Sequence, residues 1–185
     1  MNAFTRTLFY LITALIVTAC MTSKDWRTAS RDSASIAPDP LKHREAVVQV
    51  YGADAWGWRG WFAIHTWIAV KKSDQQQYTV HDVVGWRGYR GNPVLSSSSD
   101  IPDRHWFGAK PQLLVEHRGE GVDSLINDIE SAVESYPWKN EYTAFPGPNS
   151  NTFVAWVGKQ VPGLNLKLPF SAIGSGYINQ IGDNL

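Results

Sequence analysis

The chain has a single cysteine, Cys20, among its 185 residues. A disulfide within one chain and a cysteine-based zinc site each need at least two thiols, so both are excluded. Charge of neither sign prevails, because Lys+Arg and Asp+Glu each number 17. A basic face for nucleic acid is therefore not expected. Long apolar runs are also scarce, and the run Leu8–Val17 is too short to cross a bilayer as a helix.

The N-terminus has the pattern of an export signal. Arg6 precedes the apolar run, and the small residues Val17-Thr18-Ala19 lead directly into Cys20. This arrangement resembles the lipobox of bacterial lipoproteins, which predicts that residues 1–19 are removed and that Cys20 carries lipid. Met21 follows the cysteine, so Asp, the inner-membrane retention signal known from enterobacteria at this position, is absent. We therefore expect a lipid-anchored envelope protein on the outer membrane, facing the periplasm. An ordinary secretory peptide or an uncleaved anchor is the alternative.

The rest of the chain predicts one α+β domain. Residues 20–43 are polar and rich in Ser, Asp and Pro, which is typical of a flexible tether. The domain is expected over 44–185, as a small antiparallel sheet packed against two or more helices. Apolar and β-branched runs predict strands at 46–51, 61–71, 78–86 and 113–117, and apolar spacing with Pro and Gly stops predicts helices at 122–135 and 153–161. Residues 52–60 are rich in turns, and 87–108 are expected to be irregular.

Tryptophan is abundant, with nine residues, and two of them lie in a repeated tetrad. Gly57-Trp58-Arg59-Gly60 recurs as Gly85-Trp86-Arg87-Gly88. The two tetrads are either glycine turns with the indoles packed inward or the walls of one groove. In the second case Trp58 and Trp86, together with Trp67, would line a binding surface.

Two polar groups stand out as candidates for chemistry. His65 lies inside the apolar strand WFAIHTWIAV, where a histidine loses hydration and needs partners for its ring nitrogens. Ser150 lies in PNSNT, where a helix is expected to begin and unpaired backbone N–H groups favour negative charge. A serine there could act as a nucleophile, with Asn149 and Asn151 beside it in a binding role. Each of these three residues is also a good helix N-cap.

A histidine base usually needs an acceptor that orients it, and the next strand offers His81 or Asp82. Their side chains point to opposite faces of the strand, so one of them can meet His65. Asp82 is preferred, because a carboxylate fixes the tautomer of the imidazole and supports its charged form. The spacing of His105, Glu116 and His117 matches no zinc pattern, so neither a metal nor a cofactor is expected.

Several long motifs carry a resemblance to a known family. AVVQVYGADAWGWRGWFAIHTWIAVK, VVGW, GPNSNTFVAW and LPFSAIGSGY resemble the bacterial domain of unknown function 3750 family over about residues 45 to 177. More distantly, the order of polar residues is similar to circularly permuted papain-like proteins, such as cell-wall amidases and lecithin–retinol acyltransferase-like enzymes. That resemblance implies a single papain-like domain with His65 as base, Asp82 or His81 orienting it, and Ser150 where those enzymes have cysteine.

Two functions follow as expectations. The first is a Ser/His hydrolase or acyltransferase-like site acting on an amide or ester, with Ser150 attacking and His65 taking its proton. The second is a non-catalytic binding or scaffold lipoprotein, in which Ser150 caps the helix and tryptophans line a groove. In both cases we expect a monomer held to the membrane through Cys20, with a cell-wall fragment, a peptide or a lipid as its ligand.

Overall fold

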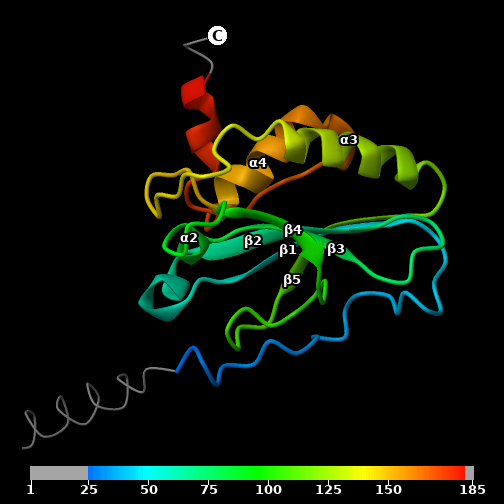
Figure 1. Cartoon of the computed structure of the whole chain (residues 1–185), viewed down its shortest axis with the longest axis horizontal. Coiled ribbons are helices and arrows are strands. Elements are labelled where there is room, and N and C mark those ends of the chain that lie inside the picture. Colours follow the sequence, from blue (N-terminus) through cyan, green and yellow to red (C-terminus); the bar gives the residue numbers. More distant parts are fainter. Residues whose placement is uncertain (1–24, 182–185) are drawn as a thin grey trace, which may run out of the picture.

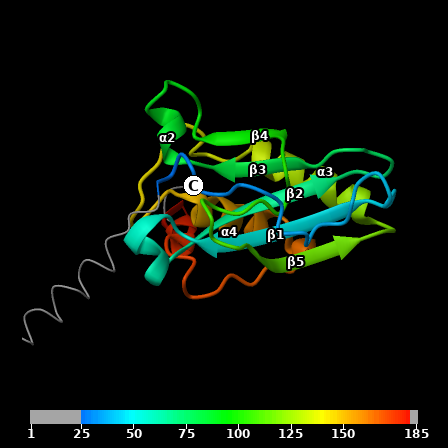
Figure 2. The same cartoon turned by 90° about the horizontal axis from the view of Figure 1, so that it is seen from below.

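A computed structural model describes residues 25–181 and has an α+β architecture (Figure 1). Five antiparallel strands form one sheet in the order β4-β3-β2-β1-β5 (Figure 2). The strands are β1 (Val47–Asp54), β2 (Ile64–Lys71), β3 (Thr79–Val83), β4 (Leu95–Ser99) and β5 (Gln112–Arg118). The predicted fold class, an antiparallel sheet packed against helices, is therefore confirmed.

The two long helices lie on one face of the sheet (Figure 1). They are α3 (Val122–Glu134) and α4 (Ser150–Gln160), and their apolar sides close the main core against β1 and β2. Alternate residues of each strand enter this core, as the two-residue period of a strand requires. The core includes Val48 and Val50 of β1 and Ile68 and Val70 of β2.

The other face of the sheet is covered by segments without regular structure. Tyr51, Trp67 and Val80 pack there against Trp106 and Phe107. The stretch expected as a flexible tether contributes to this layer, because Ile36 and Ala37 pack against it and their N–H groups donate to the buried carboxylate of Asp103 at 2.6 and 3.0 Å. The described part of that stretch, residues 25–43, thus belongs to the folded body.

The short elements depart most from the sequence prediction. Strand β4 lies within 87–108, a stretch that the sequence predicts to be irregular. It is an edge strand with an exposed half, so its Ser-rich sequence has no apolar pattern to indicate a strand. Both tetrads form single helical turns, η1 (Gly57–Trp61) and α2 (Gly85–Gly88). Two further 3-10 turns, η2 (Pro162–Leu164) and η3 (Ser175–Ile181), occupy the tail.

The export signal and Cys20 lie outside the described residues. Within residues 25–181, no helix is long and apolar enough to cross a membrane.

Strand β3 points two titratable residues in opposite directions. His81 faces the helices with its Nδ1 2.8 Å from Ser97 Oγ, and Asp82 faces the other side. His81 is 3% exposed, and burial lowers the pKa of its imidazole to about 4, with weak opposition from Glu130. It is the neutral form of His81 that the fold accommodates.

The burial of His81 predicts a pH dependence of stability. The unfolded chain takes up a proton near pH 6.5 and the folded chain near 4, so stability is full above pH 6.5 and is lost as pH falls toward 4. The loss attributable to His81 should be about 2–3 kcal/mol. Urea unfolding at pH 7 and pH 4.5 measures it, and His81→Leu should flatten the dependence. Equal slopes in both proteins would contradict this assignment.

Candidate functional site

His65 lies where β2 and β3 separate. The ladder between these strands joins Ile68–Val70 to Thr79–His81, and the strands diverge toward Ile64. His65 therefore sits on a central strand beside a gap in the sheet, on the face away from the helices. Its residue exposure is 6%.

A short hydrogen bond orients the imidazole of His65. Its Nε2 is 2.8 Å from Oδ1 of Asp82, and both side chains are buried. Burial alone would raise the pKa of Asp82, but His65 and Arg104 outweigh it and hold that pKa below its usual range. The ionised carboxylate can only accept, so Nε2 carries the hydrogen and Nδ1 is left as the basic nitrogen.

Two residues that the sequence prediction missed hold this pair in place. Arg104 donates to Oδ2 of Asp82 at 2.8 Å and pairs with Asp100 at 3.1 Å. Trp106 stacks on the ring of His65, with centroids 3.5 Å apart and planes at 7°. Arg31 also lies near Asp82 and Asp100, so two cations balance the two carboxylates around this pair.

The N-terminus of α4 is capped by Asn149 and not by Ser150. The side-chain oxygen of Asn149 accepts from the N–H groups of Asn151 and Thr152 at 2.9 and 3.1 Å, and Thr152 Oγ1 accepts from the Asn149 N–H. This reciprocal arrangement is a capping box. The expectation that Ser150 could serve as the cap is therefore wrong, and its hydroxyl is left free of that task.

Asn151 fixes α4 against β2. Its amide nitrogen donates to the carbonyls of Ile64 and Ile173, and its oxygen accepts from Thr66 Oγ1 at 2.9 Å. The same Thr66 hydroxyl lies 3.3 Å from the carbonyl oxygen of Ser150. Thr66, the residue after His65, is thus bonded to the backbone of Ser150. This contact holds the start of the helix beside the gap between β2 and β3.

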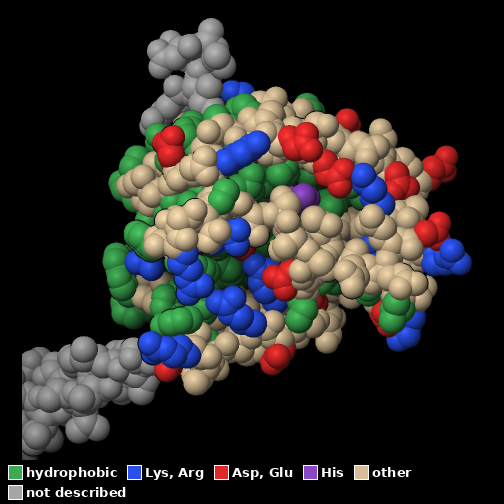
Figure 3. Space-filling view, in the orientation of Figure 1, with side chains coloured by type: hydrophobic (Ala, Val, Ile, Leu, Met, Phe, Trp, Pro, Cys, Tyr) green, Lys and Arg blue, Asp and Glu red, His purple; other side chains and the backbone are tan. Residues whose placement is uncertain are grey.

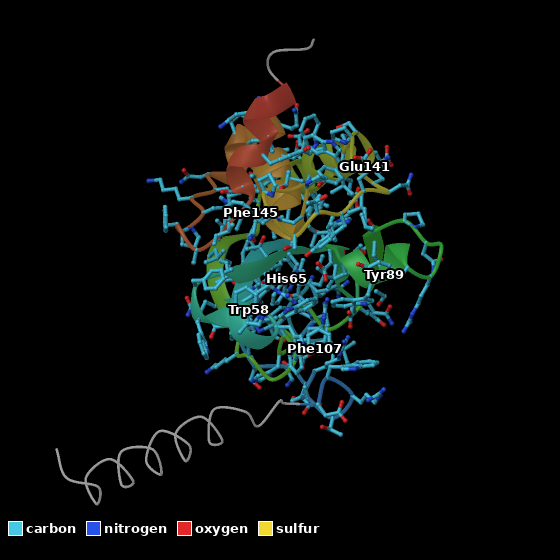
Figure 4. The ribbon with its side chains drawn as sticks, turned by 90° about the vertical axis from the view of Figure 1, so that its left-hand side faces the viewer. Trp58, His65, Tyr89, Phe107, Glu141 and Phe145 are labelled. Carbon is cyan, nitrogen blue, oxygen red and sulfur yellow. The ribbon has the colours of Figure 1, made fainter. Side chains whose placement is uncertain are left out.

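His65 and Ser150 line one cleft of about 450 Å³ at this end of the sheet. In the part of the chain that the structure describes, neither His65 Nδ1 nor Ser150 Oγ has a hydrogen-bond partner within the protein. Neither atom is among the fully buried atoms that have no partner. Both groups therefore face the cleft. Seven aromatic side chains line it, namely Trp56, Trp58, Phe62, Trp86, Trp106, Tyr142 and Phe145. Figure 4 looks onto this end of the molecule, with His65 among Trp58, Tyr89 and Phe145.

One backbone donor remains available at the start of α4. The N–H groups of Asn151 and Thr152 are taken by Asn149. Within residues 25–181 the N–H of Ser150 has no acceptor, and the positive end of the helix dipole lies at this point. The arrangement offers a base, a hydroxyl and one donor for a developing negative charge.

The predicted binding residues fall into three groups. Trp58 and Trp86 line the cleft and are 64% and 39% exposed, so the inward-packed alternative for the two tetrads is wrong. The prediction that Trp67 lines a binding surface is wrong, because this residue is fully buried against Tyr51. Its indole N–H donates to the Pro102 carbonyl. Asn149 and Asn151 border the cleft, but their amide groups are used within the protein.

The capping box makes a testable distinction between neighbouring residues. Asn149→Ala removes the cap and two further bonds, to the carbonyls of Ala144 and Ile173, so it should cost about 2 kcal/mol of unfolding free energy. Ser150→Ala, the matched control, removes a hydroxyl with no protein partner and should cost less than about 0.5 kcal/mol. Urea denaturation of both variants measures this, and an equal cost would argue against the capping assignment.

Comparison with known proteins adds one relationship. No curated protein and no solved structure matches the chain. A family model described as "Protein of unknown function (DUF3750)" matches residues 45–177, a stretch that holds His65, Asp82 and Ser150. The chain therefore belongs to the DUF3750 family.

Proposed function

We propose that this protein is a lipid-anchored envelope hydrolase or acyltransferase that uses Ser150 and His65 on an amide or ester. The observation that carries the proposal is the shared cleft, into which an oriented imidazole and a hydroxyl with no capping duty both open. Burying His65 and Asp82 is costly, and a purely structural sheet gains no evident benefit from it. A buried carboxylate with a shifted pKa, paired with a residue that lines a cleft, is typical of functional sites.

The chemical step follows from the positions of the groups. Ser150 Oγ attacks the carbonyl carbon while His65 Nδ1 takes the hydroxyl proton, and the Ser150 N–H stabilises the resulting oxyanion. The bond to the leaving amine or alcohol then breaks, and His65 returns the proton to it. Water releases the acyl group in a hydrolase, and a second alcohol or amine accepts it in a transferase.

The order of these residues resembles that of permuted papain-like proteins, and this resemblance supports the proposal. A histidine on one strand, an orienting carboxylate on the next and a hydroxyl at a helix start follow the order that the resemblance implies. Serine in place of cysteine excludes a preformed thiolate–imidazolium pair, because its pKa is far higher. Proton removal would then occur during attack, as in serine hydrolases.

A binding role without catalysis is the second candidate, and one observation favours it. In the described chain no hydrogen bond joins His65 to Ser150, and a single backbone donor serves the oxyanion position. On this view the cleft holds an apolar ligand in the envelope without turning it over. Labelling of Ser150 distinguishes the two candidates.

A fluorophosphonate probe tests the catalytic proposal directly. The wild-type protein should form an adduct on Ser150, because His65 raises the nucleophilicity of that hydroxyl. His65→Ala should lower the labelling rate by about 10²-fold or more, the usual contribution of a positioned base. Ser150→Ala should abolish labelling, while Ser135→Ala, which removes the serine at the C-terminal end of α3, outside the cleft, should not. Absence of an adduct on folded wild-type protein would favour the binding role.

Ser150→Cys tests whether His65 reaches the residue at this position. A thiol beside the imidazole should form a thiolate below its usual pKa, so iodoacetamide should modify it near pH 6.5 about tenfold faster than in the Ser150→Cys/His65→Ala double variant. Cys20 is held by lipid in the mature protein and contributes no background. Equal rates in the two variants would show that the imidazole and the side chain at 150 do not interact.

A further inference from the structure

The large exposed apolar side chains concentrate at the end of the molecule that carries the cleft. Trp61 is 83% exposed, Tyr89 93%, Phe145 75% and Phe170 102%. All lie in segments that border the cleft, namely η1, the turn after α2, the loop before α4 and the segment that bonds to Ile64. Exposed aromatics that gather at one end of a molecule in this way mark an interaction surface.

Arginines accompany these aromatic residues. Segments 55–63 and 84–93 contain the two tetrads and carry Arg59, Arg87 and Arg90, with no Asp or Glu among them. Figure 3 shows Lys and Arg side chains gathering at the lower left of the displayed face, beside hydrophobic side chains. Aromatic rings with neighbouring arginines are typical of protein surfaces that lie in the interface of an anionic membrane.

The start of the described chain lies at the same end. The Ser30 carbonyl accepts from Gly108, and Arg31 lies over the ring of Phe107 at 4.2 Å. Phe107 in turn packs against Trp56 and Trp86 at the cleft. If Cys20 carries lipid, the five residues to Asp25 span at most about 18 Å, so the anchor holds this end near the bilayer.

The apolar wall of the cleft favours an apolar chain over a sugar as the occupant of this surface. Glycans need several hydrogen-bond partners beside the aromatic rings, and with the amides of Asn149 and Asn151 used within the protein the cleft offers few besides His65 and Ser150. Phe62 and Phe145 add apolar surface with no polar group. An apolar chain fits this wall better than a polyhydroxyl ligand does.

We propose that the cleft-bearing end, the surface formed by the two tetrad turns, Phe145 and Phe170, docks on an anionic bilayer, so that the cleft opens toward the acyl chains of lipids. The docking surface does not depend on chemistry at Ser150. The identification of a lipid acyl group as substrate rests on the proposed function. Failure of docking and failure of catalysis are therefore separate results.

Fluorescence quenching tests the docking surface. The mature lipidated protein is placed in phosphatidylethanolamine–phosphatidylglycerol vesicles whose acyl chains carry bromine, which quenches tryptophans at the membrane. Wild type should be quenched, and Trp58→Phe/Trp61→Phe should remove about half of the quenched component, because interfacial indoles lie at headgroup depth. Trp138→Phe, at a half-buried site against Tyr136 and Tyr177, is the matched control and should leave it unchanged.

The arginines of the docking surface allow a second test. Arg59→Gln/Arg87→Gln/Arg90→Gln should reduce quenching, and so should vesicles without phosphatidylglycerol or high salt. Arg44→Gln, near the β2–β3 turn where Arg44 pairs with Asp74, should have no effect. Ser150→Ala should dock like wild type. Unquenched wild-type protein, or quenching that survives the Trp58/Trp61 substitutions, would overturn the proposal. A wall glycan or a protein partner would then be the candidate ligand of this surface.

Discussion

The hydrogen bond between His65 and Asp82 is the interaction on which the candidate site depends. It lies on the sheet face away from the helices, where a lone imidazole or carboxylate would be costly. The bond fixes which ring nitrogen is basic and directs that nitrogen into the cleft. Arg104 bonds to Asp82 and Trp106 stacks on His65, so one loop fixes both the position of the carboxylate and the plane of the imidazole.

Much of this arrangement could be predicted from residues alone. A polar residue inside an apolar strand identified His65, and strand alternation reduced its partner to His81 or Asp82. The geometry settled that choice, because β3 directs Asp82 toward His65 and His81 toward the helices. The family motifs, the strand and helix order and the start of the last helix near Ser150 were likewise readable, since each follows from local periodicity or turn chemistry.

The rest depended on contacts between distant segments. Arg104 and Trp106 lie in a stretch with no periodic signal, and their importance follows from packing against residues about 20 to 40 positions earlier in the chain. Trp67 resembled a groove residue, but tertiary packing turned its indole inward. Which of three adjacent polar residues caps α4 depended on backbone angles at Asn149, and a row of equivalent cap types could not reveal them.

The contacts of Asp103 have a consequence for how the domain is delimited. This carboxylate joins Ser33, Ile36 and Ala37 to the loop that continues into Arg104 and Trp106. The family boundary at residue 45 excludes that N-terminal segment. A recombinant fragment trimmed to the boundary would lose the segment that covers the sheet face away from the helices. It would also lose the contacts that hold the loop of Arg104 and Trp106. Inactivity of such a fragment would therefore reflect a damaged scaffold and not the chemistry of the intact protein.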